Sequence, residues 1–382
     1  MPGRRVARRQ PVDPTAGLVG GAAAVSVAGL IFLGSGNLCH FDWALLPYAV
    51  AAIVSAAATA YRVTLWLQRP PTRRYWRQGW RLFRRGGALR HGVSLTRSLL
   101  ANFAAQRFIA RRSRRRWLTH LCLSWGSMLA FALTFPLVFG WVHFATPAAD
   151  LHTYQLFVLG VRVQEFSVDS LPALLLFNAL NFSAALVLGG VALSLHRRLT
   201  ESGALALQQF GQDLFPLLLL SAVAATGLGL TVSAHWLHGR GFRFLAFAHA
   251  AAVVALLFSL PFGKLFHIFQ RPLHLSVGLY KQAAQAGPQA RCVRCRQPFA
   301  SQMQVQDLEQ VLAELAFDYR PNGPAPPYQQ VCPPCRRKLL ALNQARTLGG
   351  VGGWGLGVSK REDEGQQNTT PQPLGSHPFF ES

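Results

Sequence analysis

Two histidines, His249 and His267, lie eighteen residues apart in an apolar stretch from Gly241 to His274 that contains no acidic residue. On an uninterrupted helix, eighteen residues make five full turns and rise about 27 Å, so both imidazoles would project from one face near opposite surfaces of a bilayer. Neutral imidazole is the usual axial ligand of haem iron. The spacing therefore predicts two haem sites, one near each membrane surface.

A second pair of histidines, His120 and His143, belongs to an earlier apolar stretch that would cross in the opposite direction. Antiparallel neighbours would set His120 opposite His267 on the inner side and His143 opposite His249 on the outer side. Because they are twenty-three residues apart, the side chains of His120 and His143 would point about 140° apart around an ideal helix. A kink at Pro136 could bring them back to the same face. The alternatives are His235 or His238 for the outer site and His274 for the inner one.

Four of the six cysteines form two pairs, Cys292-x-x-Cys295 and Cys332-x-x-Cys335, separated by thirty-six residues. Four thiolates suit tetrahedral zinc or a single iron ion. The pairs predict a metal-binding module in a reducing compartment rather than a disulfide framework. Structural zinc is the first interpretation, and a rubredoxin-like iron is the alternative because the second pair begins Cys-Pro.

The composition is typical of a polytopic membrane protein. Of the 382 residues, 51% are hydrophobic and only 14% are charged, and apolar runs long enough to cross a bilayer recur along the chain. We expect an all-α protein with six transmembrane helices, at Ala16–Gly34, Trp43–Leu67, Trp117–Phe144, Asp169–Leu195, Leu214–Leu237 and Phe242–Gln270. The net charge of +23 agrees with the positive-inside rule, which places both termini on the cytoplasmic side. We expect the protein in the inner (plasma) membrane of the cell.

Residues 69–116 contain fifteen arginines, no lysine and no acidic residue, interleaved with aromatic side chains. The pattern is typical of a cytoplasmic loop with interfacial amphipathic helices held by the anionic headgroups of the lipid bilayer. A docking surface for an acidic partner subunit is the alternative, and the two interpretations are compatible. The segment contains no recognised nucleic-acid-binding module, so no nucleic-acid partner is expected.

The central portions of the six apolar stretches contain no Asp or Glu. Proton-coupled transporters commonly place acidic side chains within the bilayer, so this absence argues against that class and favours haem-binding histidines. The chain then divides into a basic arm with two helices (1–68), the arginine-rich loop (69–116), a four-helix haem-binding core (117–280), a cytoplasmic four-cysteine metal module (288–346) and a disordered tail (347–382).

Two stretches carry a family resemblance. They are QRFIARRSRRRWLTH, which ends at His120, and HAAAVVALLFSLPFGKLFHIFQRP, which contains His249 and His267. Over roughly residues 101–280 the chain resembles the gamma subunit of respiratory nitrate reductase and related membrane subunits of heterodisulfide reductases. The resemblance implies a cytochrome b-type subunit that takes electrons from the quinone pool by oxidising quinol. It would pass them through two bis-histidine b haems to an oxidoreductase subunit docked on the inner face.

A quinol pocket would need polar side chains that accept protons beside one haem. Lys264 near His267 is a candidate, and Asp169 and Arg243 are candidates near the outer haem. Asp169 is also suited to cap the helix that follows it. A haem-free small-molecule transporter or a metal-sensing membrane protein is the alternative function for the whole chain.

Overall fold

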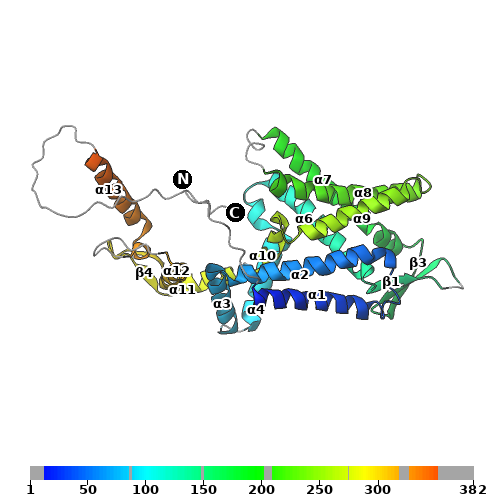
Figure 1. Ribbon diagram of the computed structural model, residues 1–382, viewed down its shortest axis with the longest axis horizontal. Coiled ribbons are helices and arrows are strands. Elements are labelled where there is room, and N and C mark those ends of the chain that lie inside the picture. The colour runs from blue at the N-terminus through cyan, green and yellow to red at the C-terminus, as the bar shows by residue number, and fades with distance from the viewer. Residues whose placement is uncertain are drawn as a thin grey trace, which may run out of the picture. The chain divides into compact units, whose positions relative to one another are not determined.

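The structure is a computed structural model that describes residues 13–85, 88–147, 150–201, 209–273, 275–317 and 327–351 (Figure 1). It contains two compact units. A helical unit comprises residues 1–289 and 301–318, and a cysteine unit comprises residues 290–300 and 319–382. The tail expected to be disordered was 347–382, but residues 347–351 are helical and end α13 (Pro333–Val351). The remainder of the tail lies outside the described residues.

The prediction of six membrane-spanning helices is confirmed at the level of length and composition. The described residues include six helical segments long and apolar enough to cross a membrane, at Pro14–Gly34, Trp43–Gln68, Arg114–Val138, Leu171–Thr200, Phe210–His235 and Phe242–Ser259. Five are formed mainly by α1 (Pro14–Gly34), α2 (Leu46–Gln68), α6 (Arg114–Val138), α7 (Leu171–Thr200) and α9 (Phe242–Ser259). The remaining one consists of a short π-helix, η3 (Phe210–Leu214), followed by α8 (Phe215–His235).

Large apolar side chains remain exposed along the outer faces of these helices. Leu174 on α7 is 59% exposed and Phe244 on α9 is 77% exposed. In water such faces would be strongly unfavourable, whereas hydrocarbon tails solvate them. The chain is therefore a multi-pass membrane protein whose helices contact the lipid bilayer.

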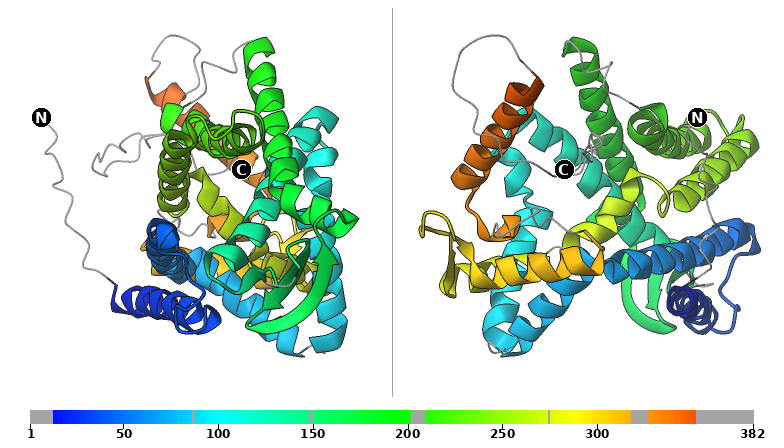
Figure 2. Two further views of the ribbon diagram at one scale, coloured as in Figure 1. Left: turned by 90° about the vertical axis from the view of Figure 1, so that its right-hand side faces the viewer. Right: turned by 60° about the vertical axis from the view of Figure 1, so that its left-hand side comes forward.

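The helices pack in neighbouring pairs, and the two figures show α1 beside α2 and α8 beside α9 (Figure 1, Figure 2). The tightest approach is between α6 and α7. A Cβ atom on Gly126 would lie 2.8 Å from Val187, and one on Gly190 would lie 2.8 Å from Leu123. Ser183 donates a buried 2.7 Å hydrogen bond to the carbonyl of Gly126. Glycine is required at both positions because any side chain would force the helices apart.

The last predicted helix is interrupted. Residues 242–270 do not form one helix, because α9 ends at Ser259 and is followed by a short 3-10 helix, η4 (Lys264–Phe266), and by α10 (His267–Leu273). Pro261 and Gly263 cause the break. Proline has no N–H group to donate to the helical hydrogen bond, and glycine lets the backbone leave the helical conformation. The free carbonyl of Pro261 accepts a hydrogen bond from Arg62 of α2.

The protein is not entirely α-helical. The third span was expected to reach Phe144, but α6 ends at Val138, and Gly140 follows with a φ of 71°. An antiparallel sheet follows, in the order β1 (Val142–Ala145), β2 (Thr153–Val158), β3 (Val161–Ser167). The turn between β2 and β3 has positive φ at both of its central residues, 159 and 160, as two-residue hairpins require.

The arginine-rich loop forms helices. They are α3 (Pro70–Arg85), α4 (Ala88–Leu99), the π-helix η2 (Leu100–Ala104) and α5 (Arg107–Ala110). Helix α3 packs against α11 (Leu275–Ala286) and α12 (Gln302–Glu314), all within the helical unit. Residues 302–314, which were expected in the metal module, therefore belong to the other unit.

The cysteine unit is small. Among the described residues of this part of the chain, β4 (Gln289–Arg291) pairs with β5 (Pro298–Ser301). They are followed by η5 (Tyr328–Gln330) and α13 (Pro333–Val351). Its buried side chains include three of the four paired cysteines and Val331.

Candidate functional site

The structure brings together two of the four predicted histidine ligands, His120 and His267. His120 lies on the second turn of α6, and His267 begins α10. Their ring centroids are 6.5 Å apart with the ring planes at 64°. Two imidazoles bound to opposite sides of one metal ion, each at about 2 Å from it, place their ring centres roughly 6 Å apart. The pair is therefore spaced for axial ligation of a single iron.

Hydrogen bonds on the two Nδ1 atoms orient both rings. The Nδ1 of His120 lies 2.8 Å from Oε1 of Gln106, and the Nδ1 of His267 contacts the backbone carbonyl of Lys264. Since a carbonyl oxygen only accepts hydrogen bonds, each Nδ1 carries the proton and each Nε2 keeps a free lone pair. Metal-ligating histidines are typically oriented in this way.

Both rings line a cavity of about 910 Å³ within the helical unit. The volume lies within the range of about 300–1,000 Å³ typical of cofactor sites. Most of the wall is apolar and comes from α2, α6, α8, α9 and α10, and it includes Phe131, Phe135 and Leu257. Arg271 is the charged residue among the described residues that line the cavity.

The break after α9 decides where His267 lies. The sequence predicted His249 and His267 on one face of a single helix, but the two histidines belong to different helices. Phe266, just before His267, is buried and lies under the Arg62 guanidinium at 4.7 Å. His267 is thus positioned by the packing of the interrupted segment rather than by an eighteen-residue helical repeat.

The other two predicted ligands are not brought together. His249 lies on α9, and its Nδ1 is 3.0 Å from the Thr226 hydroxyl of α8. Gly227 leaves room for the ring, because a Cβ there would lie 3.3 Å from it. In the described part of the chain no histidine ring packs against His249. The alternative ligands are both exposed: His235 is the last residue of α8, and His238 lies in the turn that follows it.

His143 lies on β1 instead of on a transmembrane helix. Its ring stacks between His40, at 4.3 Å, and Phe157 of β2, at 5.0 Å. Its Nδ1 is buried and has no hydrogen-bond partner. Burial and the neighbouring His40 lower the pKa of His143, so this ring is held neutral in an aromatic stack.

The predicted quinol-site residues lie in different places. Lys264 forms an ion pair with Asp213 of η3, and the carbonyl of Lys264 is the group that orients His267. Asp169 is exposed in the turn before α7, where the hydroxyl of Ser170 serves as the helix cap. Arg243 is exposed in the first turn of α9. Only Lys264 is therefore adjacent to the histidine pair.

Sequence reasoning missed Gln106, which contacts His120 directly. It is 4% exposed and has a φ of 50°, a left-handed conformation that is rare for residues other than glycine. Its position before α5, in an arginine-rich segment, carries no sequence signal that points to His120. The contact arises only because the chain folds back against α6 at this residue.

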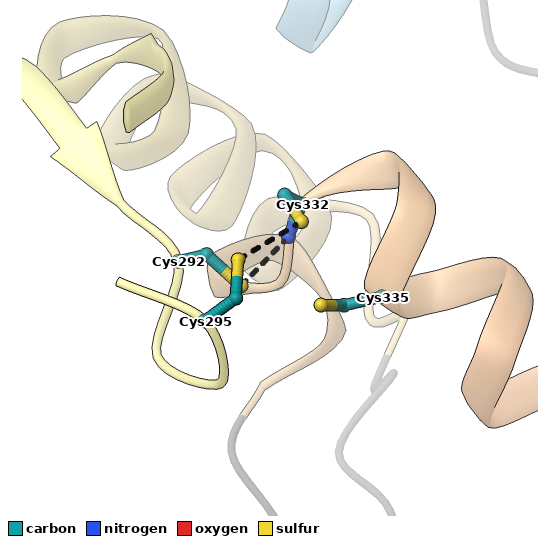
Figure 3. Close-up of side chains that lie close together, drawn as sticks. All are labelled: Cys292, Cys295, Cys332 and Cys335. Atoms are coloured by element: carbon teal, nitrogen blue, oxygen red, sulfur yellow. Dashed lines mark hydrogen bonds between the residues drawn. The ribbon is translucent and has the colours of Figure 1, made fainter. Parts of the chain in front are cut away.

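The predicted four-cysteine cluster is confirmed as a group that can hold a metal ion. The sulfur atoms of Cys292, Cys295, Cys332 and Cys335 all lie within 4.8 Å of one another (Figure 3). The first pair lies on the turn after β4, and the second pair lies at the start of α13. The sulfurs of Cys295 and Cys332 are 3.6 Å apart, and the Cys332 amide donates to the Cys292 sulfur at 3.3 Å.

The pKa values of two cysteines in the cluster, Cys292 and Cys335, are shifted in opposite directions. Burial alone would raise the pKa of Cys292, but the backbone N–H groups of Cys332, Cys295 and Arg294 lower it to about 6. The pKa of Cys335 is raised to about 12, first by its hydrogen bond with Cys332 and then by burial. Concentrated thiol groups of this kind are stabilised when a cation replaces their protons.

A polar network ties the arginine-rich helix α3 to α12. The hydroxyl of Tyr280 on α11 donates a 2.6 Å hydrogen bond to Asp307. Arg74 lies 3.4 Å from Asp307 and 3.0 Å from Glu314, and Arg73 lies 2.7 Å from Glu314. These two arginines therefore have acidic partners within the same chain.

Comparison with known proteins yields no relative: no family model, no curated protein and no solved structure matches this chain.

Proposed function

We propose that this protein is a membrane electron-transfer subunit that binds one b-type haem between His120 and His267. The observation that carries the proposal is the 6.5 Å histidine pair at the wall of the apolar cavity, with both Nδ1 atoms already engaged. Haem would supply one-electron chemistry there, and the protein would set its position and potential.

The chain's own residues define what the site would do. His120 and His267 would hold the haem iron through their Nε2 atoms. Arg271 lines the cavity with its guanidinium 4.6 Å from the centroid of the Phe108 ring, and none of the ion pairs among the described residues involves it. Its charge could therefore pair with a propionate. The surrounding Phe131 and Phe135 exclude water, which favours the less charged, reduced form of a buried redox centre.

The proposal assigns one haem rather than the two predicted, because His249 and His143 have separate partners. Lys264, whose carbonyl orients His267, forms an ion pair with Asp213. If quinol is the electron donor, this pair is the group that we propose to accept its protons. Orientation in the inner membrane, with His120 on the cytoplasmic side, rests on the distribution of arginines.

The experiment is a reduced-minus-oxidised absorption spectrum of the purified full-length protein. We expect a b-type signal corresponding to one haem per chain. His120→Ala and His267→Ala should each abolish it, while the matched control His249→Ala should retain it. Absence of haem from well-folded protein would refute the proposal and favour a haem-free transporter or metal-sensing protein.

For the cysteine unit we propose a structural zinc ion. The cluster is largely buried, with Cys292 only 1% exposed, and its four sulfurs complete a tetrahedral site with no open position for a substrate. Metal analysis of the full-length protein should find about one zinc per chain. Iron in its place, with a rubredoxin-like absorption spectrum, would favour the redox alternative.

A further inference from the structure

We infer that Gln106 is a positioning residue that fixes the tautomer of His120 and thereby sets the reduction potential of the haem. This inference rests on the proposed function of the histidine pair. It concerns a side chain that lies outside the ligand set and belongs to the segment connecting the arginine-rich helices to α6.

The first step is the orientation of the Gln106 amide. Ser124 donates its hydroxyl proton to the carbonyl of Leu121 at 3.3 Å, so its oxygen is available to accept. The Gln106 Nε2 donates to this oxygen. The other end of the amide, Oε1, must then face His120 at 2.8 Å. In this arrangement every group in the chain of hydrogen bonds has a partner.

The second step is the effect on His120. With Oε1 as the acceptor, the proton resides on Nδ1 and the Nε2 lone pair faces away from Gln106. Hydrogen bonding at Nδ1 makes an imidazole a more basic ligand. A more basic ligand stabilises the oxidised iron, which carries one more positive charge, so the hydrogen bond lowers the reduction potential.

The third step is the backbone. Gln106 has a φ of 50°, a left-handed conformation that is unfavourable for a residue other than glycine and persists only where its surroundings hold it. Two tryptophans on α6 hold the flanking residues in place: Trp117 donates to the carbonyl of Ala105 at 2.9 Å, and Trp125 donates to that of Ala104 at 3.1 Å. The strained residue is thus clamped against α6, and its amide is directed at His120.

The test compares Gln106→Leu and Gln106→Glu with the wild-type protein. We expect Gln106→Leu to raise the midpoint potential and to weaken haem retention roughly 10- to 100-fold. Gln106→Glu keeps an oxygen for Nδ1 and should hold the potential at or below the wild-type value. The matched control is Asn178→Leu on α7, because the amide of Asn178 bonds only to Leu174 and Asn181 in the described structure and the residue does not line the cavity. It should leave the potential unchanged.

The outcomes separate the two proposals. Haem in the wild-type protein, with potential and retention unaltered in Gln106→Leu, would overturn the inference and leave the proposed function standing. Absence of haem from the wild-type protein would overturn both. If Gln106→Leu does not accumulate, Ser124→Ala provides the test, because loss of the group that orients the amide should also raise the potential. An unchanged potential there would count against the inference.

Discussion

The hydrogen bond from Tyr280 to Asp307 should hold α12 against α11, which itself packs on the arginine-rich helix α3. Tyr280→Phe removes only the hydroxyl, because the ring remains in its edge contact with Tyr75 at 5.0 Å. Asp307 is 6% exposed and has two partners, the Tyr280 hydroxyl at 2.6 Å and Arg74 at 3.4 Å. The substitution therefore leaves a buried carboxylate with only the longer of its two contacts.

The expected cost follows from the charge of the acceptor. A hydrogen bond to a charged group contributes about 1.5–3 kcal/mol, and water cannot easily replace it at a buried site. If α12 opens locally, the amides of residues 303–313 should exchange roughly 10- to 150-fold faster in Tyr280→Phe than in the wild-type protein. Hydrogen exchange followed by mass spectrometry measures this change.

The matched control is Tyr75→Phe. Tyr75 belongs to the same ring pair, but its hydroxyl makes no hydrogen bond in the described structure. Burial and the charge of Asp307 raise the pKa of Tyr75, so both tyrosines remain neutral at pH 7 and the two substitutions remove the same uncharged group. Equal exchange of α12 in Tyr280→Phe and Tyr75→Phe would refute the reasoning.

Three further predictions follow from the helix packing, the ion pairs and the cysteines. Gly190→Ala should destabilise the α6–α7 contact by about 1–3 kcal/mol and lower the melting temperature, while Gly189→Ala, which faces open space, should not; equal melting temperatures would contradict the packing argument. The two arginines beside Glu314 lower its pKa below the usual 4.5, so its contribution to the docking of α12 is present above that value and is lost as the pH falls through the lowered value. Protection factors of α12 measured between pH 3 and 6 should show this loss, and Glu314→Gln should abolish the pH dependence. Cys332→Ser should release the metal, whereas Cys122→Ser on α6 should retain it, and metal analysis of both variants would expose a wrong ligand assignment.

Much of the architecture could be predicted because transmembrane helices are determined by local composition. Six apolar stretches of sufficient length predict six spans whatever their neighbours are, and the structure has them. The four-cysteine cluster was predictable for a similar reason. Two residues between paired cysteines let both sulfurs reach one ion, so each half of the site is specified locally.

Helix continuity was harder to predict. The stretch from Phe242 to Gln270 has the composition of a single span, and its Pro261 and Gly263 were compatible with either a kink or a complete break. Arg62, from a different helix, caps the carbonyl of Pro261 and so makes the interruption tolerable. That partner lies 199 residues away in the sequence, where no local pattern reveals it.

The sequence by itself determined the membrane class, the approximate spans, the two cysteine pairs and the candidate set of histidines. Each of these depends on residue type or short spacing. Only the tertiary structure decided which histidines lie close together. His120 and His267 come from separate helices, and His143 lies in a strand and stacks on His40. Only the structure placed Gln106 against His120, since a contact made by a strained turn depends on the packing of α6 around it.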